Sequence, residues 1–475
     1  MPDSTDPTGA AQAAAPTYIS LPSRMPGFEQ TGPCRESARL VNLGTRSEPR
    51  IREMPLLVVP GAPCGPAPVS CPRCGAPTRA NGTTTHALAH LPMGGSWVRA
   101  EVEVPRRRCT ACGATARAPE PFRAEGHMAT AALVAFCEDL LALGRTLREV
   151  ASSTGLCPQV VKEIDRARLE RLYTDGAPGG PRSLSRPAAQ SRLLGVDEFK
   201  LHDGHRYATL VVDLETGHVL WLARGKRKAC VEGFFDHVGD AWMAGVEAVA
   251  CDMNSDYEEA FRGRFPHVSV VFDRFHLVKN LNDKVVSEVR KDVQRGLEEA
   301  GDREGARRLK RTKYLLMASR ATREAWESSG PGGPSEKPAS LFSGEVRPRW
   351  RAGEESAARY RELMASNELL FAADLVKDAV ELAYSLSDEA EMREVVAFAA
   401  ALCRETGNAH FAWFARLLEG HMDGICAHAR RPISSGRVEG TNNMIKTLRR
   451  RHYGLPDDEY FFLKVMDASH RKDRW

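Results

Sequence analysis

The sequence lacks any uninterrupted run of about 18 apolar residues, so no part of it is expected to cross a membrane as a helix. Its opening residues, MPDSTDPTGAAQAAAPT, contain neither the basic stretch nor the apolar stretch of a secretory signal. Internal repeats are also missing, which excludes a solenoid or propeller. These absences predict a cytoplasmic protein with no membrane partner.

A strong charge of either sign is missing as well. The net charge of +4 over 475 residues does not by itself indicate a nucleic-acid partner. The distribution of the basic residues is more informative, because it concentrates positive charge locally. Basic clusters occur at 106–108, 303–313, 446–451 and 471–472.

Disulfide-like cysteine spacing is scarce: four of the 12 cysteines form two Cys-x-x-Cys pairs, and the others show no such spacing. Each pair is followed by glycine, in Cys71-Pro-Arg-Cys74-Gly and Cys109-Thr-Ala-Cys112-Gly. Zn²⁺ takes four thiolates in a tetrahedron, and one such turn supplies two of them. The segment between the pairs resembles a β-hairpin that would bring them together. His86 and His90 are alternative ligands, but we expect packing or surface roles for them.

The length of 475 residues exceeds one ordinary core, so several domains are expected. Gly, Pro and Ser dominate residues 174–190, which indicates a linker without regular structure. Short β-rich runs and then helices follow this linker, which predicts a mixed α/β domain. The predicted divisions are a disordered N-terminus (1–27), a zinc-binding β domain (28–122), a helix-turn-helix (128–173), the linker (174–190), the first part of a catalytic core (191–276), a helical insertion (277–430) and the final part of the core (431–475).

Two helices separated by a turn at Gly155 are predicted within LREVASSTGLCPQVVKEIDRARLERL. The pattern buries Val161, Ile164 and Leu169 on the second helix, which begins at Pro158. The residues it displays can meet base edges and phosphates in a major groove, as in a DNA-binding helix-turn-helix. These displayed candidates are Gln159, Lys162, Arg166 and Arg168. An ordinary helical hairpin is the alternative.

Three carboxylates stand at chemically suggestive places. Asp197 ends the first predicted strand, Asp252 ends the fourth, and Glu439 lies where a helix begins. Carboxylates gathered at strand ends repel one another unless divalent cations lie between them, so this pattern favours Mg²⁺ or Mn²⁺ and phosphoryl transfer. Helical spacing places Glu439 on one face with Lys446 and Arg450. The candidates for contact with DNA phosphates on this helix are Lys446, Arg449, Arg450 and Arg451.

These motifs together resemble the ISL3 family of bacterial DDE insertion-sequence transposases. The resemblance runs from about Cys71 to Tyr460 and is carried by CPRCG, RRRCTACG, GVDEFKLHDGHRYATLVVDLETG, DRFHLVKNLN and GRVEGTNNMIKTLRRRHYG. It implies a ribonuclease-H-like core with a helical insertion, and a Mg²⁺-dependent acidic triad. It also implies cleavage and joining of double-stranded DNA, namely transposon ends and target, by a homodimer or higher oligomer near the nucleoid.

The second member of the triad has two candidates. The place after the fourth strand favours Asp252, whereas Asp273 opens the motif DRFH and is also suited to cap a helix. His276 in this motif is an accessory candidate that would orient Asp273 or touch the scissile phosphate. Two other functions remain open, a DNA-binding regulator that has lost catalysis and a ribonuclease-H-like nuclease that cuts without joining.

Overall fold

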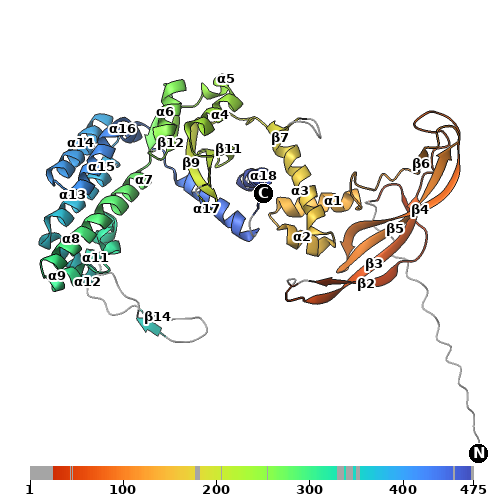
Figure 1. Ribbon diagram of the computed structural model, residues 1–475, viewed down its shortest axis with the longest axis horizontal. Helices are drawn as coiled ribbons and strands as arrows, with labels where there is room; N and C mark the ends of the chain where they lie inside the picture. Colours follow the sequence, from red (N-terminus) through yellow and green to blue (C-terminus); the bar gives the residue numbers. More distant parts are fainter. Residues whose placement is uncertain are drawn as a thin grey trace, which may run out of the picture. The chain divides into compact units, whose positions relative to one another are not determined.

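The structure, a computed structural model, describes residues 25–42, 44, 47–176, 182–204, 206–253, 255–328, 336–338, 346–348, 354–452 and 455–471. The chain divides into two compact units, Met1–Ser185 with Lys446–Trp475, and Arg186–Ile445. Each has its own sheet and helices (Figure 1). The predicted disordered segment 1–27 lies outside the described residues except for its last three. Within the part of the chain that is described, no helix is both long and apolar enough to cross a bilayer.

A six-stranded sheet begins the first unit, with the order β1–β3–β5–β4, β2 beside β3 and β6 beside β5. Its strands are β1 (Phe28–Gln30), β2 (Arg35–Asn42), β3 (Ile51–Pro63), β4 (Thr78–Met93), β5 (Ser96–Cys109) and β6 (Thr115–Arg117). The alternate residues Ala100, Val102 and Val104 of β5 point into a core with Leu88 and Phe122. The predicted hairpin between the cysteine pairs is confirmed as β4 and β5.

Three helices follow in the first unit: α1 (Ala131–Ala142), α2 (Leu147–Thr154) and α3 (Pro158–Tyr173). The Thr146 side chain caps α2, and Glu149 returns a bond to the Thr146 N–H. The helix ends at Gly155, whose φ of 76° suits glycine and whose added Cβ would meet Trp97 at 2.8 Å. The predicted pair of helices with a turn at Gly155 is therefore confirmed.

The linker is more regular than its composition predicted. β7 (Thr174–Asp175) pairs with β8 (Ser183–Leu184), Thr174 opposite Leu184. Residues 177–181 lie outside the description. The correction concerns only the ends of the segment, where Thr174–Asp175 and Ser183–Leu184 pair on either side of the Gly- and Pro-rich centre.

The second unit is built on a mixed five-stranded sheet of order β11–β10–β9–β12–β13. Its strands are β9 (Leu193–His202), β10 (Arg206–Asp213), β11 (Val219–Arg224), β12 (Ala248–Cys251) and β13 (Ser269–Phe272). β9, β10 and β11 are antiparallel neighbours, whereas β9, β12 and β13 run parallel. The helices that connect them are α4 (Lys228–Val238), α5 (Asp240–Met243) and α6 (Ser255–Arg264).

One face of this sheet carries the main core. Leu194 and Val196 of β9 pack in one cluster with Phe235 of α4 and Tyr257 of α6. Successive strand residues point to opposite faces, so Gly195 and Asp197 of β9 lie on the other face. This other face is where the chain returns at the end of the unit.

A long helical segment separates β13 from that return, as predicted. It comprises α7 (Arg274–Asn280), a π-helical turn η1 (Leu281–Val286), α8 (Ser287–Glu299), α9 (Arg303–Leu309), α10 (Lys313–Leu316), α11 (Arg320–Ser328), β14 (Glu336–Pro338), β15 (Val346–Pro348), α12 (Glu354–Ser366), α13 (Glu368–Ala383), α14 (Glu389–Glu405), α15 (Ala409–Gly420) and α16 (Met422–Arg430). Figure 1 shows α13, α14 and α15 side by side. The Tyr384 hydroxyl donates to the Phe272 carbonyl at 3.0 Å, which ties this segment to β13.

Two helices end the chain, α17 (Gly436–Arg451) and α18 (Asp458–Ser469). The residues from Lys446 on belong with the first unit, although residues 431–475 were predicted to complete the catalytic core. The reason is that α18 packs on α3 through buried ion pairs, among them Lys464 Nζ to Asp165 at 2.8 Å. Only the first part of α17 therefore belongs to the second unit.

Candidate functional site

The two predicted aspartates lie where the parallel pairing of two neighbouring strands ends. Gly195 of β9 pairs with Ala250 of β12, and the parallel ladder ends at Val196 and Cys251. Asp197 and Asp252 each come next along their strands, so the topology brings them side by side. One detail differs from prediction, because Asp197 does not end its strand: β9 continues to His202, paired with β10. Asp197 marks the end of the pairing with β12 instead.

Helix α17 crosses the sheet face that carries Asp197. A Cβ added at Gly195 would lie 2.4 Å from Cγ2 of Val438, so the absence of a side chain there admits the helix. One turn further, Asn442 Nδ2 donates to Asp197 Oδ2 at 2.6 Å. Val438 and Asn442 are four residues apart on α17 and therefore lie on one face of the helix. Gly195 and Asp197 are two residues apart on β9 and therefore lie on one face of the sheet.

The sequence analysis did not predict a role for Asn442, although this residue lies in the motif GRVEGTNNMIKTLRRRHYG. It is 8% exposed, and its Oδ1 is buried without a hydrogen-bond partner among the described residues. A buried polar atom without a partner is costly and often marks a functional site. The glycine inside the apolar run LLGVD was the available signal, since a glycine in a strand often indicates close approach of another segment.

The electrostatics of Asp197 reflect this enclosure. Burial raises the pKa of its carboxyl, and the charges of Asp252 and Glu198 raise the pKa further, whereas His276 and the Glu198 N–H lower it. Asp252 acts on Asp197 in this way because the strand register places the two aspartates next to each other. Such a pair gains most from a cation, because a cation offsets both the lost hydration and the mutual repulsion.

His276 contacts Asp252 rather than Asp273. Its Nδ1 lies 3.4 Å from Asp252 Oδ1, and the imidazole is mostly buried while the carboxylate is 40% exposed. The Met253 N–H also donates to that oxygen, at 2.6 Å. Asp252 is thus oriented from two sides and still open to solvent, as a ligand or catalytic carboxylate needs to be.

Asp273 has a different environment. Its Oδ1 accepts from the Phe275 N–H at 3.1 Å, which caps α7, and its Oδ2 accepts from the Ser435 N–H at 2.7 Å and from the Ser435 hydroxyl. The side chain is 5% exposed. Asp273 therefore fixes the chain just before α17, and this engagement favours Asp252 as the second acid.

Glu439 lies in the first turn of α17 and is exposed, with Asn443, Lys446 and Arg450 on the same solvent face. The predicted apolar stripe is buried, Val438 at 0%, Ile445 at 2% and Leu448 at 7%. Asp197, Asp252 and Glu439 do not converge to common ligand distance: among the described residues, the one group of three or more His, Cys, Asp or Glu side chains with ligand atoms within 4.8 Å of one another is a cysteine set.

That cysteine set is Cys71, Cys74, Cys109 and Cys112. The Sγ atoms of Cys74 and Cys112 lie 3.5 Å apart, and those of Cys71 and Cys112 lie 3.7 Å apart. The register of the β4–β5 hairpin explains this, since Thr78 pairs with Cys109 and so holds the two turns together. Four thiolates at these distances suit a tetrahedral Zn²⁺.

The backbone conformation of the two Cys-x-x-Cys turns favours cysteines in the thiolate form. Gly75 and Gly113 have φ of 73° and 71°, conformations that glycine adopts without strain. The N–H groups of Cys112 and Ala111 donate to Cys109 Sγ and lower the pKa of its thiol to about 6. The two histidines are engaged elsewhere, His86 with Glu120 at 2.9 Å and His90 with Thr130 at 2.9 Å. Both histidines therefore contact other side chains, which fits the packing roles expected for them.

Arg168, one of the residues predicted to contact DNA, is not exposed to solvent. Arg168 is 4% exposed, and it pairs with Asp165 at 2.9 Å and with Asp467 of α18 at 3.1 Å. Burial opposes its charge, but the two aspartates outweigh burial and raise its pKa. The correction has a simple cause: α18 covers this side of α3, and a guanidinium can be buried only beside carboxylates.

Its neighbours on α3 are also engaged. Lys162 Nζ lies 3.4 Å from Asp457, and Arg166 lies 2.8 Å from the same carboxylate. Gln159 is exposed at the start of α3 and donates to Glu163 at 3.1 Å. The acidic start of α18 thus offsets much of the positive charge that the sequence assigned to this face.

The basic end of α17 is more accessible. Lys446, Arg450 and Arg451 are exposed, and Arg449 lies over the Phe461 ring at 4.9 Å. Arg451 reaches Glu149 of α2 at 3.6 Å. Positive charge therefore continues from the end of α17 to the N-terminus of α2.

Comparison with known proteins gives matches to two families and to curated relatives. The family described as "Transposase" matches residues 194–465, and the "zinc-finger of transposase IS204/IS1001/IS1096/IS1165" matches residues 67–112. The transposase for insertion sequence element IS1001 of Bordetella parapertussis is 30% identical over 402 residues, 84% of this chain and 88% of that protein. The transposase for IS1557 of Mycobacterium tuberculosis (strain CDC 1551 / Oshkosh) is 25% identical over 417 residues, 84% and 86% of the two chains. The chain belongs to the ISL3 family of insertion-sequence transposases.

Proposed function

We propose that this transposase cleaves DNA at the ends of its insertion sequence and joins the 3′ ends to target DNA, using Asp197, Asp252 and Glu439. The observation that carries the proposal is the placement of the two aspartates where the parallel pairing of β9 and β12 ends, with the Glu439 helix packed over β9 at Gly195. The printed names of the relatives, transposases for IS1001 and IS1557, support the reaction class.

The sheet supports a ribonuclease-H-like assignment. Three antiparallel strands are followed by two parallel ones, with the first strand of the unit in the centre. The helical segment enters after β13, between the second aspartate and the third acid. This is the arrangement that the family resemblance implied for a core with an insertion.

The acids suit Mg²⁺ or Mn²⁺, because such ions prefer oxygen ligands and two of these carboxylates are already neighbours. Asp197 and Asp252 would hold the ions, with Glu439 completing the set from α17. Bound ions would supply activation of a water or 3′-OH and stabilisation of the leaving oxygen. Because carboxylates repel one another, we expect Glu439 to approach the aspartates only when cations are bound.

The surrounding residues position these acids. Asn442 holds one oxygen of Asp197, and the Glu198 N–H holds the other at 2.8 Å. His276 restrains Asp252, and Asp273 fixes the start of the helix that bears Glu439. Orientation by hydrogen bonds to ligand carboxylates is a general feature of metal sites.

Recognition of DNA would lie in the first unit. The zinc-bearing hairpin and the α2–α3 pair are the elements suited to this, α2–α3 as a helix-turn-helix, and Gln159, Lys446, Arg450 and Arg451 are exposed polar or basic candidates for contact. Joining two transposon ends requires two active sites, so we propose a homodimer or larger assembly on DNA.

A strand-transfer assay with labelled transposon ends tests the function. Cleavage and joining, both dependent on Mg²⁺ or Mn²⁺, are expected. Binding without cleavage would instead indicate a DNA-binding regulator, and cleavage without joining would indicate a nuclease. Either outcome would overturn the proposal.

A further inference from the structure

We propose that a groove between β2 and the α2–α3 turn is where the first unit holds the sugar–phosphate backbone of duplex DNA. This inference rests on the proposed function and names the contact surface, which differs from the α3 face that the sequence indicated. The groove lies wholly within the first unit and has a volume of about 1280 Å³.

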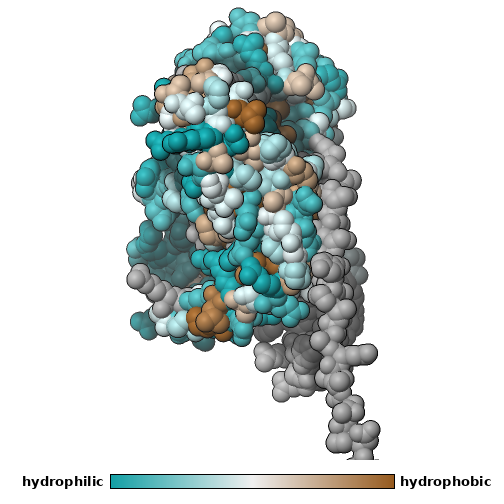
Figure 2. Space-filling model, turned by 90° about the vertical axis from the view of Figure 1, so that its right-hand side faces the viewer, coloured by the Kyte–Doolittle hydropathy of each residue, from teal (hydrophilic) through white to brown (hydrophobic). Residues whose placement is uncertain are grey.

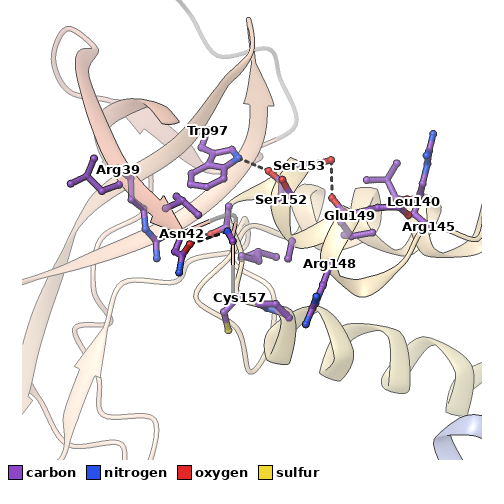
Figure 3. A pocket seen from close by; sticks show the side chains of 18 residues that line it. Arg39, Asn42, Trp97, Leu140, Arg145, Arg148, Glu149, Ser152, Ser153 and Cys157 are labelled. Carbon is purple, nitrogen blue, oxygen red and sulfur yellow. Dashed lines mark hydrogen bonds between the residues drawn. The ribbon is translucent and has the colours of Figure 1, made fainter. Parts of the chain in front are cut away.

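The two walls of the groove come from distant parts of the sequence (Figure 3). Arg39 and Asn42 of β2 stand on one side, and Arg148 of α2 and Arg145, just before that helix, stand on the other. Trp97 lies between the walls, and its Nε1 donates to the Ser152 carbonyl at 3.2 Å, which fixes α2 against the sheet. The groove is therefore a built feature rather than a gap between mobile parts.

Positive charge dominates its described lining, three arginines against one glutamate. All three guanidinium side chains belong to exposed residues. Arg39 is held over the Trp97 ring at 6.0 Å and donates to the Gly155 carbonyl at 3.3 Å, so it is ordered without being neutralised by that contact. Arginines ordered in this way are suited to phosphate, because the planar guanidinium can donate two hydrogen bonds at once.

Glu149, the one glutamate among the described lining residues, already has hydrogen-bond and ion-pair partners within the protein. Its carboxylate accepts from the Thr146 N–H at 2.7 Å and pairs with Arg451 at 3.6 Å. The Thr146 N–H lowers its pKa most, and the charges of Arg451 and Arg145 lower it further. Glu149 therefore links Arg451 of α17 to the edge of the groove, and the arginines beside it offset its negative charge.

The α3 face offers a contrast within the same unit. Lys162 and Arg166 share Asp457, and Arg168 is buried between Asp165 and Asp467. A phosphate would have to displace these carboxylates first. The face turned to the viewer in Figure 2 is mostly hydrophilic, with hydrophobic residues in small separate patches.

The test compares two double variants with equal loss of charge, in the full-length protein. Arg39→Ala with Arg148→Ala changes the groove, and Lys162→Ala with Arg166→Ala changes α3. Fluorescence anisotropy would measure binding to a duplex from the insertion-sequence end and to a scrambled duplex, between 50 and 300 mM salt. The groove variant should lose at least about tenfold affinity on both probes and about two units of salt slope, since each lost phosphate contact removes about one unit.

The α3 variant should stay within about threefold of the wild type. Arg39→Lys with Arg148→Lys should restore the salt slope, and the exposed single variant Arg148→Glu keeps the test valid if the double variant folds poorly. Equal binding by the groove variants, or a larger loss in the α3 variant, would overturn the inference while leaving the function intact. A wild type that binds no duplex would instead contradict the proposed function.

Discussion

Asp273 and Ser435 are joined through one carboxylate oxygen: Asp273 Oδ2 accepts from both the Ser435 N–H, at 2.7 Å, and the Ser435 hydroxyl. The other oxygen caps α7, which carries His276 toward Asp252. A single buried carboxylate thus connects the helix beside Asp252 with the helix that bears Glu439. Asp273, the alternative to Asp252 in the sequence analysis, therefore holds the starts of both helices by hydrogen bonds.

Replacement of Asp273 should therefore affect stability more than chemistry. Asp273→Ala removes the acceptor of three hydrogen bonds and should lower the free energy of unfolding by about 1–3 kcal/mol, because the donors at Ser435 remain buried. Urea unfolding measures this, and joining by the folded variant should remain detectable. A fully folded Asp273→Asn protein without any activity would show instead that Asp273 is a catalytic acid.

The catalytic acids should respond in the opposite way. Asp197→Asn, Asp252→Asn and Glu439→Gln should each abolish cleavage and joining, because the amide keeps the shape but removes charge that offsets the cations. Binding to transposon ends should persist in a gel-shift assay. Asp203→Asn is the matched control, since Asp203 is exposed at the tip of the same β9–β10 hairpin and should retain activity. Activity in all three variants would refute the triad.

Asn442 offers a test through pH. Asn442→Asp would place another carboxylate beside Asp197 and raise the already raised pKa of that group. Asp197 must be ionised to hold a cation, so the acidic limb of the joining rate should move to higher pH. Titration of Mn²⁺ by calorimetry should show the same shift in binding. A pH profile like that of the wild type would contradict the role given to Asn442.

The zinc site predicts separate behaviour of the two units. Cys74→Ser or Cys109→Ser should release the metal, since the four thiolates bind as a set, and should loosen the β4–β5 hairpin. Elemental analysis would measure zinc, and limited proteolysis should cut the first unit while sparing the second. Cys64→Ser, at an exposed cysteine outside the set, is the control. Purified wild-type protein without zinc would contradict the assignment.

Replacement of Arg168 tests whether its side chain is buried between aspartates or exposed on α3. Arg168→Ala leaves Asp165 and Asp467 buried without that partner and should cost about 3–5 kcal/mol, whereas the half-exposed Lys162→Ala should cost less than about 1 kcal/mol. Urea unfolding distinguishes them, and equal small costs would indicate that Arg168 is exposed in solution.

The same cluster predicts acid sensitivity. Burial raises the pKa of Asp165, but Lys464 and Arg168 outweigh burial and hold it below the ordinary 3.8. The stabilisation is therefore present above that value and is lost as the pH falls through the lower folded-state pKa. Stability of the first unit measured against pH should decline in that window.

Local patterns sufficed for much of this protein. Cys71 and Cys109 were identified because thiolate turns have a fixed spacing, and the buried stripe of α17 at Val438 and Ile445 followed from helical period. The β-rich run at the start of β9 and the turn at Gly155 were equally local. Such features depend on residues within one or two turns of each other, so the sequence by itself determined them.

Tertiary structure decided what those side chains contact. Asp273 holds the start of α17 because Ser435, 162 positions away in the sequence, donates hydrogen bonds to it. Arg168 is buried because α18 supplies Asp467, almost 300 positions away. Asn442 reached Asp197 only because Gly195 admits α17. A charge on a helical face has the same sequence pattern whether water or a carboxylate meets it; only the packing of distant segments determines its partner.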